Sequence, residues 1–586
     1  MGNLRTDGYP RPQFARACWQ SLNGKWEFEF DDAEDGLSRG LFRGDVPLSG
    51  EIVVPYAYQC KASGINVLDH HEVVWYRRKF TLAPALAGGH VQLNFNAVDY
   101  EATVWVNGIL ACTHTGGYTA FAADITPFLK SGENVLVVRV VDRYDLEQPR
   151  GKQCWKRKPD RCWYHGTTGI WQNVWLEKIG RDYLEHVSVQ PDIDRNLIRC
   201  EAEVKYGKAD ALEVEILFRG EKVKTVRVSL DGKITKFTVE LFEFDPVDEL
   251  HYWTVEEPNL YDLSYRLLMG EEVVDEVEAY FGFRKVHRDE CGNIYLNNRP
   301  LYQRLILDQG YWADTDMTPP SPESLRSDIE MSKKMGFNGA RKHQKVEDPY
   351  FYYYADKLGF LVWGEMPSAY RFNAREMTNL NAQYIEVLKQ LSNHPSVICF
   401  VPLNESWGAR KMLTSPEVQN FGRSLYFLTH ALVPGHLVST NDGWENLDEN
   451  DILSVHDYTC FGDGFSKKYC AENCEEIYPM WRKLWAAGTK KKKLPMIMTE
   501  FGGVALKRDV KGDAWGYGGA EKDQNSFLAR VDSLFKGVYS ADFVGYCYTQ
   551  LTDVKQEVNG LLDENHKPKI PLEEIAKIVL QEGEER

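Results

Sequence analysis

The sequence predicts a multidomain protein in which a jelly-roll β-sandwich and an immunoglobulin-like β-sandwich precede a C-terminal (β/α)8 TIM barrel. The chain has 586 residues, more than one core usually covers. Short strands with Gly, Asn and Asp turn signals fill its first half, and strands then alternate with helices to its end. We therefore expect domains at residues 1–180, 181–285 and 286–586, in that order.

The first domain is predicted from segments of strand length that alternate or run apolar, such as residues 73–80 and 102–106. Asn107 and Gly108 follow the second segment. Both residue types tolerate positive φ, so the pair predicts a two-residue hairpin turn. A sandwich of the jelly-roll kind fits this pattern.

The second domain is predicted from further alternating strands, for example residues 212–218. About a hundred residues with this pattern are typical of an immunoglobulin-like sandwich. We expect it to end near residues 280–284.

The third domain shows a repeated order of strand, loop and helix, with helices expected near residues 323–335 and 349–357. Eight such strands in about 300 residues predict a (β/α)8 barrel, whose chemistry lies at the carboxyl ends of the strands. The expected strands are residues 301–307, 338–341, 360–365, 397–403, 437–440, 452–455, 495–499 and 543–548.

Composition narrows the partners. The formal net charge is −17 and the pI is about 5.4, so phosphate backbones and anionic membrane surfaces are not expected to bind. The start of the chain lacks an apolar signal-peptide core, and no stretch reaches membrane-spanning length. The 12 cysteines have no repeating short spacing, which favours free thiols and a cytoplasmic location.

Glutamates end three of the expected barrel strands, at Glu365, Glu405 and Glu500. A bare buried carboxylate is costly, so each must be paired, solvated or functional. Glycoside cleavage with retention needs two carboxyl groups about 5–5.5 Å apart, one as nucleophile and one as acid/base. Glu405 and Glu500, on the fourth and seventh strands, can face each other in this way, and Asn404 can donate to a sugar 2-hydroxyl. The alternative is that they cap strand ends beside Arg or Lys.

The chain resembles glycoside hydrolase family 2, which includes β-galactosidases, β-glucuronidases and β-mannosidases. The resemblance covers nearly the whole chain. It implies a sugar-binding role for the jelly roll, Glu405 as acid/base and Glu500 as nucleophile. It also places Arg341 near the nucleophile and Tyr458 beside it. The motifs that carry it are residues 21–26, 75–78, 105–108, 169–171, 281–284, 393–397, 404–406 and 499–503.

The chain departs from the family pattern on three strands. Residues 304–306 lack the histidine and carboxylate that the family often has on the first strand, and Asp308 is the expected substitute. His343 is offset by one position on the second strand but is expected to face the sugar. Glu365 lacks the histidine that accompanies it in relatives holding Mg²⁺, so we expect no metal and no cofactor, with Glu365 pairing with Arg341 or binding a sugar hydroxyl.

The sugar is predicted from the end of the barrel. Glu557 stands where relatives that cleave glucuronides have a cationic clamp, and it would repel a carboxylate unless Arg371 or Lys345 compensated. We therefore expect a neutral terminal sugar, first a β-galactoside and next an α-L-arabinoside, with a β-glucuronide disfavoured. Gln550 and Asp553 are expected to bind hydroxyls. The candidate stacking walls are Trp363, Trp407, Trp444, Tyr546 and Tyr548.

Two other functions remain open from the sequence. One is a non-catalytic carbohydrate-binding protein on the same scaffold, which the presence of both glutamates opposes. The other is an enzyme whose main reaction is transglycosylation, because hydrolysis and transfer share the glycosyl-enzyme intermediate. In each case the partner is a small glycoside or oligosaccharide, and association into a homo-oligomer is left open.

Overall fold

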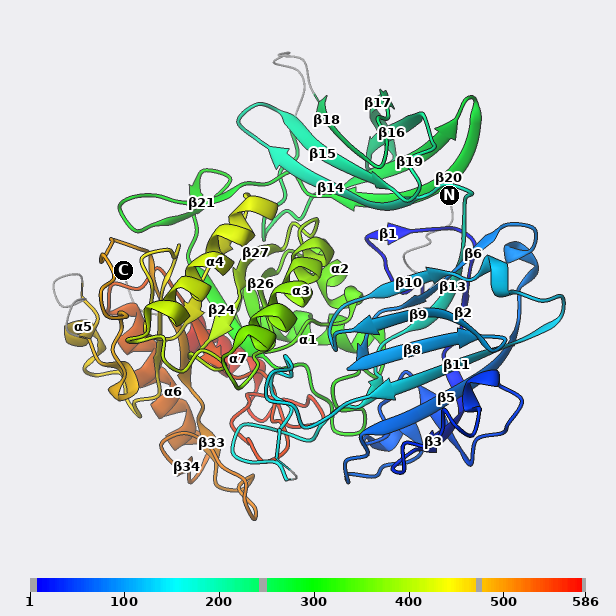
Figure 1. The fold of residues 1–586 in the computed structure, drawn as a ribbon. Coiled ribbons are helices and arrows are strands. Elements are labelled where there is room, and N and C mark those ends of the chain that lie inside the picture. Colours follow the sequence, from blue (N-terminus) through cyan, green and yellow to red (C-terminus); the bar gives the residue numbers. More distant parts are fainter. Residues whose placement is uncertain (1–7, 157, 242–249, 471–476, 582–586) are drawn as a thin grey trace.

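The computed structural model describes residues 8–156, 158–241, 250–470 and 477–581. Two β-sandwiches lie on one side of a larger unit in which helices surround a parallel sheet (Figure 1). No helix in these ranges is long and apolar enough to cross a membrane.

The first sandwich consists of two antiparallel sheets around an apolar core that includes Trp26, Tyr76 and Val104. Asn107 and Gly108 join β8 to β9 with φ values of 53° and 81°, so the predicted hairpin turn is confirmed. Its six-stranded sheet has the order β4 (Gly50–Val54), β3 (Gly24–Phe30), β5 (Val73–Thr81), β11 (Glu133–Val141), β8 (Glu101–Val106) and β9 (Ile109–Thr115). Its four-stranded sheet has the order β10 (Phe121–Asp124), β6 (His90–Phe95), β13 (Val174–Ile179) and β2 (Trp19–Ser21). A two-stranded ladder joins β7 (Val98–Asp99) to β12 (Gly169–Ile170).

The second sandwich includes a strand from the start of the chain, because Phe14 in β1 pairs with Ala279 in β20. Alternate residues of its strands, such as Leu212, Val214 and Ile216, are buried in its core. Its five-stranded sheet has the order β1 (Phe14–Ala15), β20 (Glu272–Phe281), β19 (Tyr261–Met269), β16 (Ala211–Phe218) and β17 (Glu221–Ser229). Its three-stranded sheet has the order β14 (Leu184–Asp192), β15 (Leu197–Val204) and β18 (Ile234–Glu240). A small sheet of β21 (Val286–Arg288), β22 (Ile294–Leu296) and β23 (Arg299–Pro300) follows it.

The largest sheet contains eight strands, and every described pairing between them is parallel. Each of the eight predicted strands overlaps one of them. The sheet has the order β29 (Leu437–Val438), β27 (Val397–Val401), β26 (Leu361–Glu365), β25 (Gly339–Lys342), β24 (Gln303–Asp308), β35 (Gly545–Thr549), β32 (Met496–Gly502) and β31 (Leu453–Asp457). Short strands lie beside it at β28 (Leu403–Asn404), β30 (Asn441–Asp442), β33 (Ala505–Leu506) and β34 (Ala520–Glu521).

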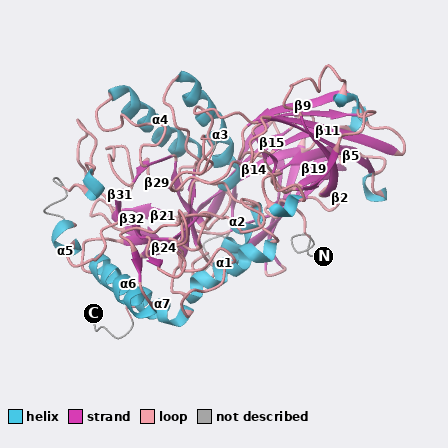
Figure 2. Ribbon diagram, turned by 90° about the horizontal axis from the view of Figure 1, so that it is seen from below, coloured by secondary structure: helices cyan, strands magenta, loops and turns pink. Residues whose placement is uncertain are grey.

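Both faces of the parallel sheet are buried, and the faces alternate along each strand. Leu305 and Leu307 of β24 belong to an inner cluster, whereas Ile306 packs in the cluster that contains the helices. Figure 2 shows the helices outside the strands of this unit. They are α1 (Pro322–Lys334), α2 (Pro349–Leu358), α3 (Ala374–Leu391), α4 (Pro416–Leu432), α5 (Phe465–Lys468), α6 (Gln524–Tyr539) and α7 (Leu572–Leu580).

The parallel sheet is curled so that its two ends approach each other. Asp442 lies in β30, just after the edge strand β29, and His456 lies in the opposite edge strand β31. The Nε2 atom of His456 is 2.9 Å from Oδ2 of Asp442. Side chains at the two edges of the sheet therefore meet at its carboxyl end.

Candidate active site

Glu405 and Glu500 face each other at this carboxyl end. Glu405 follows β28 and Glu500 lies in β32. Three atoms lie within 4.8 Å of one another: one carboxylate oxygen of Glu405, one of Glu500 and a ring nitrogen of His456. Glu405 has a left-handed φ of 52°, and its backbone N–H donates to the carbonyl of Asp442 at 2.9 Å. The strand-end turn thus directs the Glu405 carboxylate toward Glu500.

Arg341 of β25 connects the side chains around Glu405 and Glu500. Its Nε atom donates to Glu365 at 2.7 Å, and its two terminal nitrogens donate to Glu500 at 2.9 Å and Asn404 at 2.6 Å. It is also paired with Asp442 at 2.7 Å, and its side chain is fully buried. Arg341 therefore holds Asn404 and Glu500 in position and does not itself line the pocket. Since Arg341 binds Oδ1 of Asn404, the amide NH2 of Asn404 is the group left for a sugar hydroxyl.

His456 links the two glutamates, and sequence reasoning missed it. Its Nδ1 atom lies 2.8 Å from Glu405 and 3.4 Å from Glu500. Burial alone would lower the pKa of His456, but the charge of Glu500 and the bonds to Asp442 and Glu405 raise it to about 10. The only signal was its place at the end of the sixth strand, two residues before Tyr458.

The surroundings of Glu405 do not raise its pKa, as those of a general acid acting alone would. In a pair of catalytic carboxyl groups, the surroundings usually raise the pKa of the acid and lower that of the nucleophile. Burial does act to raise the pKa of Glu405, but the hydrogen bond and charge of His456 outweigh burial and lower it. The proton is therefore held by Glu405 and His456 as a pair.

Tyr458 lies beside Glu500, the residue that the resemblance implies as nucleophile. Its hydroxyl donates to Oε2 of Glu500 at 2.7 Å and lies 3.1 Å from the Thr549 hydroxyl. Its ring stacks on Tyr517 with 3.5 Å between centroids. The phenol is thus fixed where it can stabilise the Glu500 carboxylate.

A pocket with about 440 Å³ of empty volume opens above the two glutamates. Four other residues expected to bind substrate line it: Asn404, His343, Trp407 and Tyr458. Trp407 also donates from Nε1 to Glu405 at 3.2 Å.

Other residues expected to bind substrate lie outside this pocket. Asp308 is paired with Lys342 at 2.7 Å, which removes it from the first-strand role, and its neighbour Gln309 lines the pocket instead. Gln550 lies behind Gln309, accepting from its Nε2 at 2.6 Å. Tyr548 stacks against Phe535 of α6, on the helix side of the sheet.

The remaining expected contacts are also structural. Asp553 is paired with Lys569 at 2.6 Å. Trp363 and Tyr546 are fully buried in packing on the two faces of the sheet, and Trp444 packs against His456. None of these four lines the pocket. Strand-end position alone could not separate these packing contacts from ligand contacts.

Glu365 does not provide an open metal ligand. One of its oxygens accepts from Arg341 and the other accepts from Gln344 at 2.8 Å, and its side chain is fully buried. Among the described residues, Glu405, His456 and Glu500 have the spacing of a three-ligand metal group. A metal there would compete with the proton of His456 and with the reaction of both carboxylates, so these residues do not fit a resident ion.

The first sandwich contributes a wall of the pocket through the segment between β11 and β12. We call residues 150–156 and 158–165 the tongue. Gly151 N–H donates to the carbonyl of Ser368 at 3.1 Å, and Trp163 Nε1 donates to the Tyr370 hydroxyl at 2.7 Å. The tongue residues that line the pocket are Lys152, Cys162 and Trp163. Sequence reasoning missed them because this loop carries no recognisable motif.

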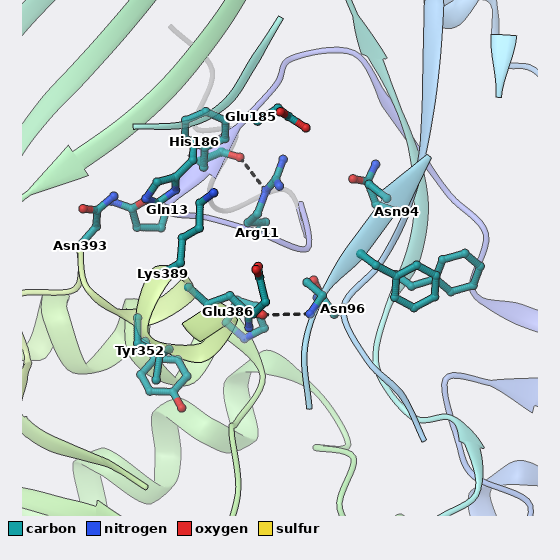
Figure 3. Close-up of a pocket in the computed structure, with 18 of the residues that line it drawn as sticks. Arg11, Gln13, Asn94, Asn96, Glu185, His186, Tyr352, Glu386, Lys389 and Asn393 are labelled. Atoms are coloured by element: carbon teal, nitrogen blue, oxygen red, sulfur yellow. Dashed lines mark hydrogen bonds between the residues drawn. The ribbon is translucent and has the colours of Figure 1, made fainter. Parts of the chain in front are cut away.

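A larger cavity, with about 1360 Å³ of empty volume, lies between the three domains (Figure 3). Polar side chains such as Arg11, Asn94, His186 and Lys389 surround it. Neither Glu405 nor Glu500 lines this cavity, so its larger size does not make it the active site.

Two family models match the sandwiches. The model described as "Glycosyl hydrolases family 2, sugar binding domain" matches residues 19–178, and the one described as "Glycosyl hydrolases family 2" matches residues 182–284.

Relatives match through more of the chain. A protein named "Putative beta-glucuronidase" from Formosa agariphila is 27% identical over 471 residues, 79% of this chain and 55% of the relative. A β-galactosidase from Thermoanaerobacter pseudethanolicus is 26% identical over 400 residues, 66% of this chain and 50% of the relative. The chain thus spans about half the length of these curated relatives. Their names do not support the expectation that glucuronides are disfavoured.

The fold agrees with solved structures across the whole chain. A β-glucuronidase from Ruminococcus gnavus superposes with a TM-score of 0.77 at 18% identity, over 99% of this chain and all of the other. A family 2 β-galacturonidase from Eisenbergiella tayi superposes with a TM-score of 0.75 at 19% identity, over 97% of this chain and 98% of the other. Residues 19–178 and 182–284 thus match the two sandwich domains of glycoside hydrolase family 2, and the chain as a whole is similar to relatives and shares the fold of solved structures of this kind.

Proposed function

We propose that the chain is a retaining, exo-acting glycoside hydrolase that removes one terminal sugar by double displacement. The observation that carries this proposal is the approach of Glu405 and Glu500, because one carboxylate oxygen of each lies within 4.8 Å of the other. Inverting enzymes need roughly 6.5–9.5 Å between carboxyl groups to admit a water, whereas retaining enzymes use about 5–5.5 Å.

Each group has a defined task in the two steps. Glu500 attacks the anomeric carbon while the leaving oxygen takes the proton held by Glu405 and His456, so one C–O bond forms as another breaks. Water then attacks the glycosyl-enzyme, giving its proton back to Glu405 and releasing Glu500. Asp442 and Arg341 hold His456 and Glu500 in place through both steps.

The barrel we propose is the curled eight-stranded sheet closed at β29 and β31. Contact between Asp442 and His456 across this junction supports closure. A closed barrel explains why residues at the ends of different strands, such as Asn404, Glu500 and Thr549, converge on one pocket.

The sugar is proposed as a β-galactoside, with an α-L-arabinoside as the related alternative. Glu557 lines the pocket, and the two cations considered as compensation lie elsewhere. Lys345 is bound to Glu347 and to two carbonyls, and Arg371 is mostly exposed beside Glu147.

A β-uronide is the second candidate. It is favoured by the names of the first two relatives, both "Putative beta-glucuronidase", and by the presence of Lys152 in the pocket.

The test is a panel of nitrophenyl β-galactoside, α-L-arabinoside, β-glucoside, β-mannoside, β-glucuronide and β-galacturonide. Proton NMR of the first-formed product should show the same anomeric configuration as the substrate. Inversion would contradict the mechanism, and binding without turnover would indicate a carbohydrate-binding protein. Product analysis with added acceptor sugars distinguishes transfer from hydrolysis.

A further inference from the structure

Lys152 is a charged group of the pocket that the two chemical steps do not use. It projects from the tongue, is half-buried, and lines the same pocket as Glu405 and Glu500. In the described part of the chain its ammonium forms no ion pair and no hydrogen bond, and the ring centroid of Tyr164 lies 6.0 Å away. A partly buried ammonium without a partner is costly, so a bound ligand is the natural partner for it.

Carboxylates surround Lys152 without touching it. Burial acts to lower the pKa of Lys152, but the nearby Cys162 thiol and the carboxylates of Glu557, Glu500 and Glu405 outweigh burial and raise it. Lys152 is therefore charged at neutral pH. No described carboxylate oxygen lies within 4.0 Å of the Lys152 ammonium nitrogen, the limit for an ion pair. The ammonium is therefore separated from these acids by the pocket that they line together.

Glu557 provides acceptors on the same wall. It is buried, and its two oxygens accept from the Tyr164 hydroxyl at 2.6 Å and from Asn559 at 3.3 Å. These donors fix the carboxylate and leave further lone pairs for a ligand. Oε1 of Gln309, in the same wall, is buried without a hydrogen-bond partner.

We propose that Lys152 and Glu557 bind adjacent hydroxyls of the terminal sugar, with Lys152 donating to one hydroxyl oxygen and Glu557 accepting from the next. This assignment rests on the proposed function and names the part of the substrate that this wall recognises. A hydroxyl both donates and accepts, so a pair of neighbouring hydroxyls satisfies an ammonium and a carboxylate placed together. A carboxylate on the ligand would pair only with Lys152, and its negative charge would be repelled by Glu557.

This makes Lys152 a specificity-determining residue supplied by the N-terminal domain. A site built to hydrogen-bond a substrate hydroxyl discriminates strongly against an analogue that lacks it, because the buried partner is then left unpaired. The tongue thus contributes to recognition of the hydroxyl groups of the sugar.

The experiment compares wild type with Lys152→Met, Lys152→Arg and the matched control Lys156→Met. Lys156 is exposed on the same tongue and paired with Asp160. The substrates are the nitrophenyl glycoside that wild type cleaves best, its 3-, 4- and 6-deoxy analogues, and the corresponding uronide. Thermal unfolding checks that each variant is folded.

We expect Lys152→Met to lower kcat/KM about 100-fold on the parent sugar, Lys152→Arg to recover part of it, and Lys156→Met to stay within about twofold. Removing the bound hydroxyl should lower kcat/KM of wild type about 30-fold or more, but that of Lys152→Met by less than about threefold. The penalty of Lys152→Met should be similar on the uronide, which keeps the same ring hydroxyls.

Three results would overturn the proposal: a penalty confined to the uronide, equal sensitivity of wild type and Lys152→Met to every deoxy analogue, or near-normal activity of Lys152→Met. In each of these cases wild type still cleaves glycosides, so the proposed function stands. If wild type cleaves no glycoside of the panel, the proposed function fails and this assignment fails with it.

Discussion

Nδ1 of His456 lies 2.8 Å from Oε1 of Glu405, so the carboxylate that we propose as acid/base shares its proton with a buried imidazole. Asp442 accepts from the other ring nitrogen, which fixes the orientation of the ring. The pair, and not Glu405 alone, determines over which pH range a proton is available to the leaving group.

Replacing His456 with Gln should move the alkaline limb of the pH profile of kcat/KM to lower pH. In wild type the pair keeps its last proton up to about pH 10, the pKa of His456. In the variant, availability of the proton depends on Glu405 alone, whose pKa is that of a carboxyl group. Kinetics from pH 5 to 10 measure the limb, with His430→Gln on α4 as the control. An unchanged alkaline limb would show that His456 does not hold the catalytic proton.

Replacing Glu500 with Ala should abolish turnover, because no glycosyl-enzyme can form. Replacing Glu405 with Ala should spare substrates with good leaving groups and be partly rescued by azide, which replaces water in the second step. Initial rates on dinitrophenyl and methyl glycosides, with and without azide, separate these roles. Near-normal turnover by Glu500→Ala would disprove the assignment of the nucleophile.

The sequence predicted the eight strands and the two rim glutamates because both leave local signals. Buried parallel strands are continuous apolar runs, and a glutamate directly after such a run is conspicuous. Asp308 carries the same kind of signal yet is paired with Lys342, because an ion pair between neighbouring strand ends depends on side-chain direction. Lys152 carries no signal at all, since a loop from another domain reaches the pocket only through the tertiary fold.

Replacing Tyr458 with Phe should lower kcat about 10- to 100-fold, because a hydrogen bond to a charged group contributes about 1.5–3 kcal/mol. The lost bond is the 2.7 Å contact to Glu500. Steady-state kinetics measure the effect, and the stacking on Tyr517 should keep the ring in place. If kcat were unchanged, the phenol would serve packing alone.

Replacing Glu376 with Gln should make stability less dependent on pH. Both carboxylate oxygens of Glu376 are buried without a hydrogen-bond partner, and burial raises its pKa from 4.5 to about 8. Because the folded-state pKa is raised, stability is full below pH 4.5 and falls as the pH rises toward 8, by an amount on the order of 4 kcal/mol.

Thermal unfolding of Glu376→Gln at pH 5 and pH 8 checks this expectation. The difference between the two midpoints should shrink relative to wild type, whereas Glu386→Gln, at an exposed position of the same helix, should leave it unchanged. An identical pH dependence in Glu376→Gln and wild type would refute the buried-carboxylate explanation.

Replacing Gly151 with Ala should raise KM about tenfold or more by displacing the tongue from the pocket. Gly151 has a φ of +57°, and a Cβ there would lie 2.3 Å from the carbonyl oxygen of Gln344, which is backbone and cannot move aside easily. Lys152 and Trp163 would shift with it, and small displacements of positioning residues have large kinetic effects. Gly132→Ala is the matched control, because Gly132 has a φ of +84° but nothing within 4 Å of its Cβ. If both substitutions raised KM equally, backbone strain would explain the weaker binding. The position of the tongue would then have no role in substrate binding.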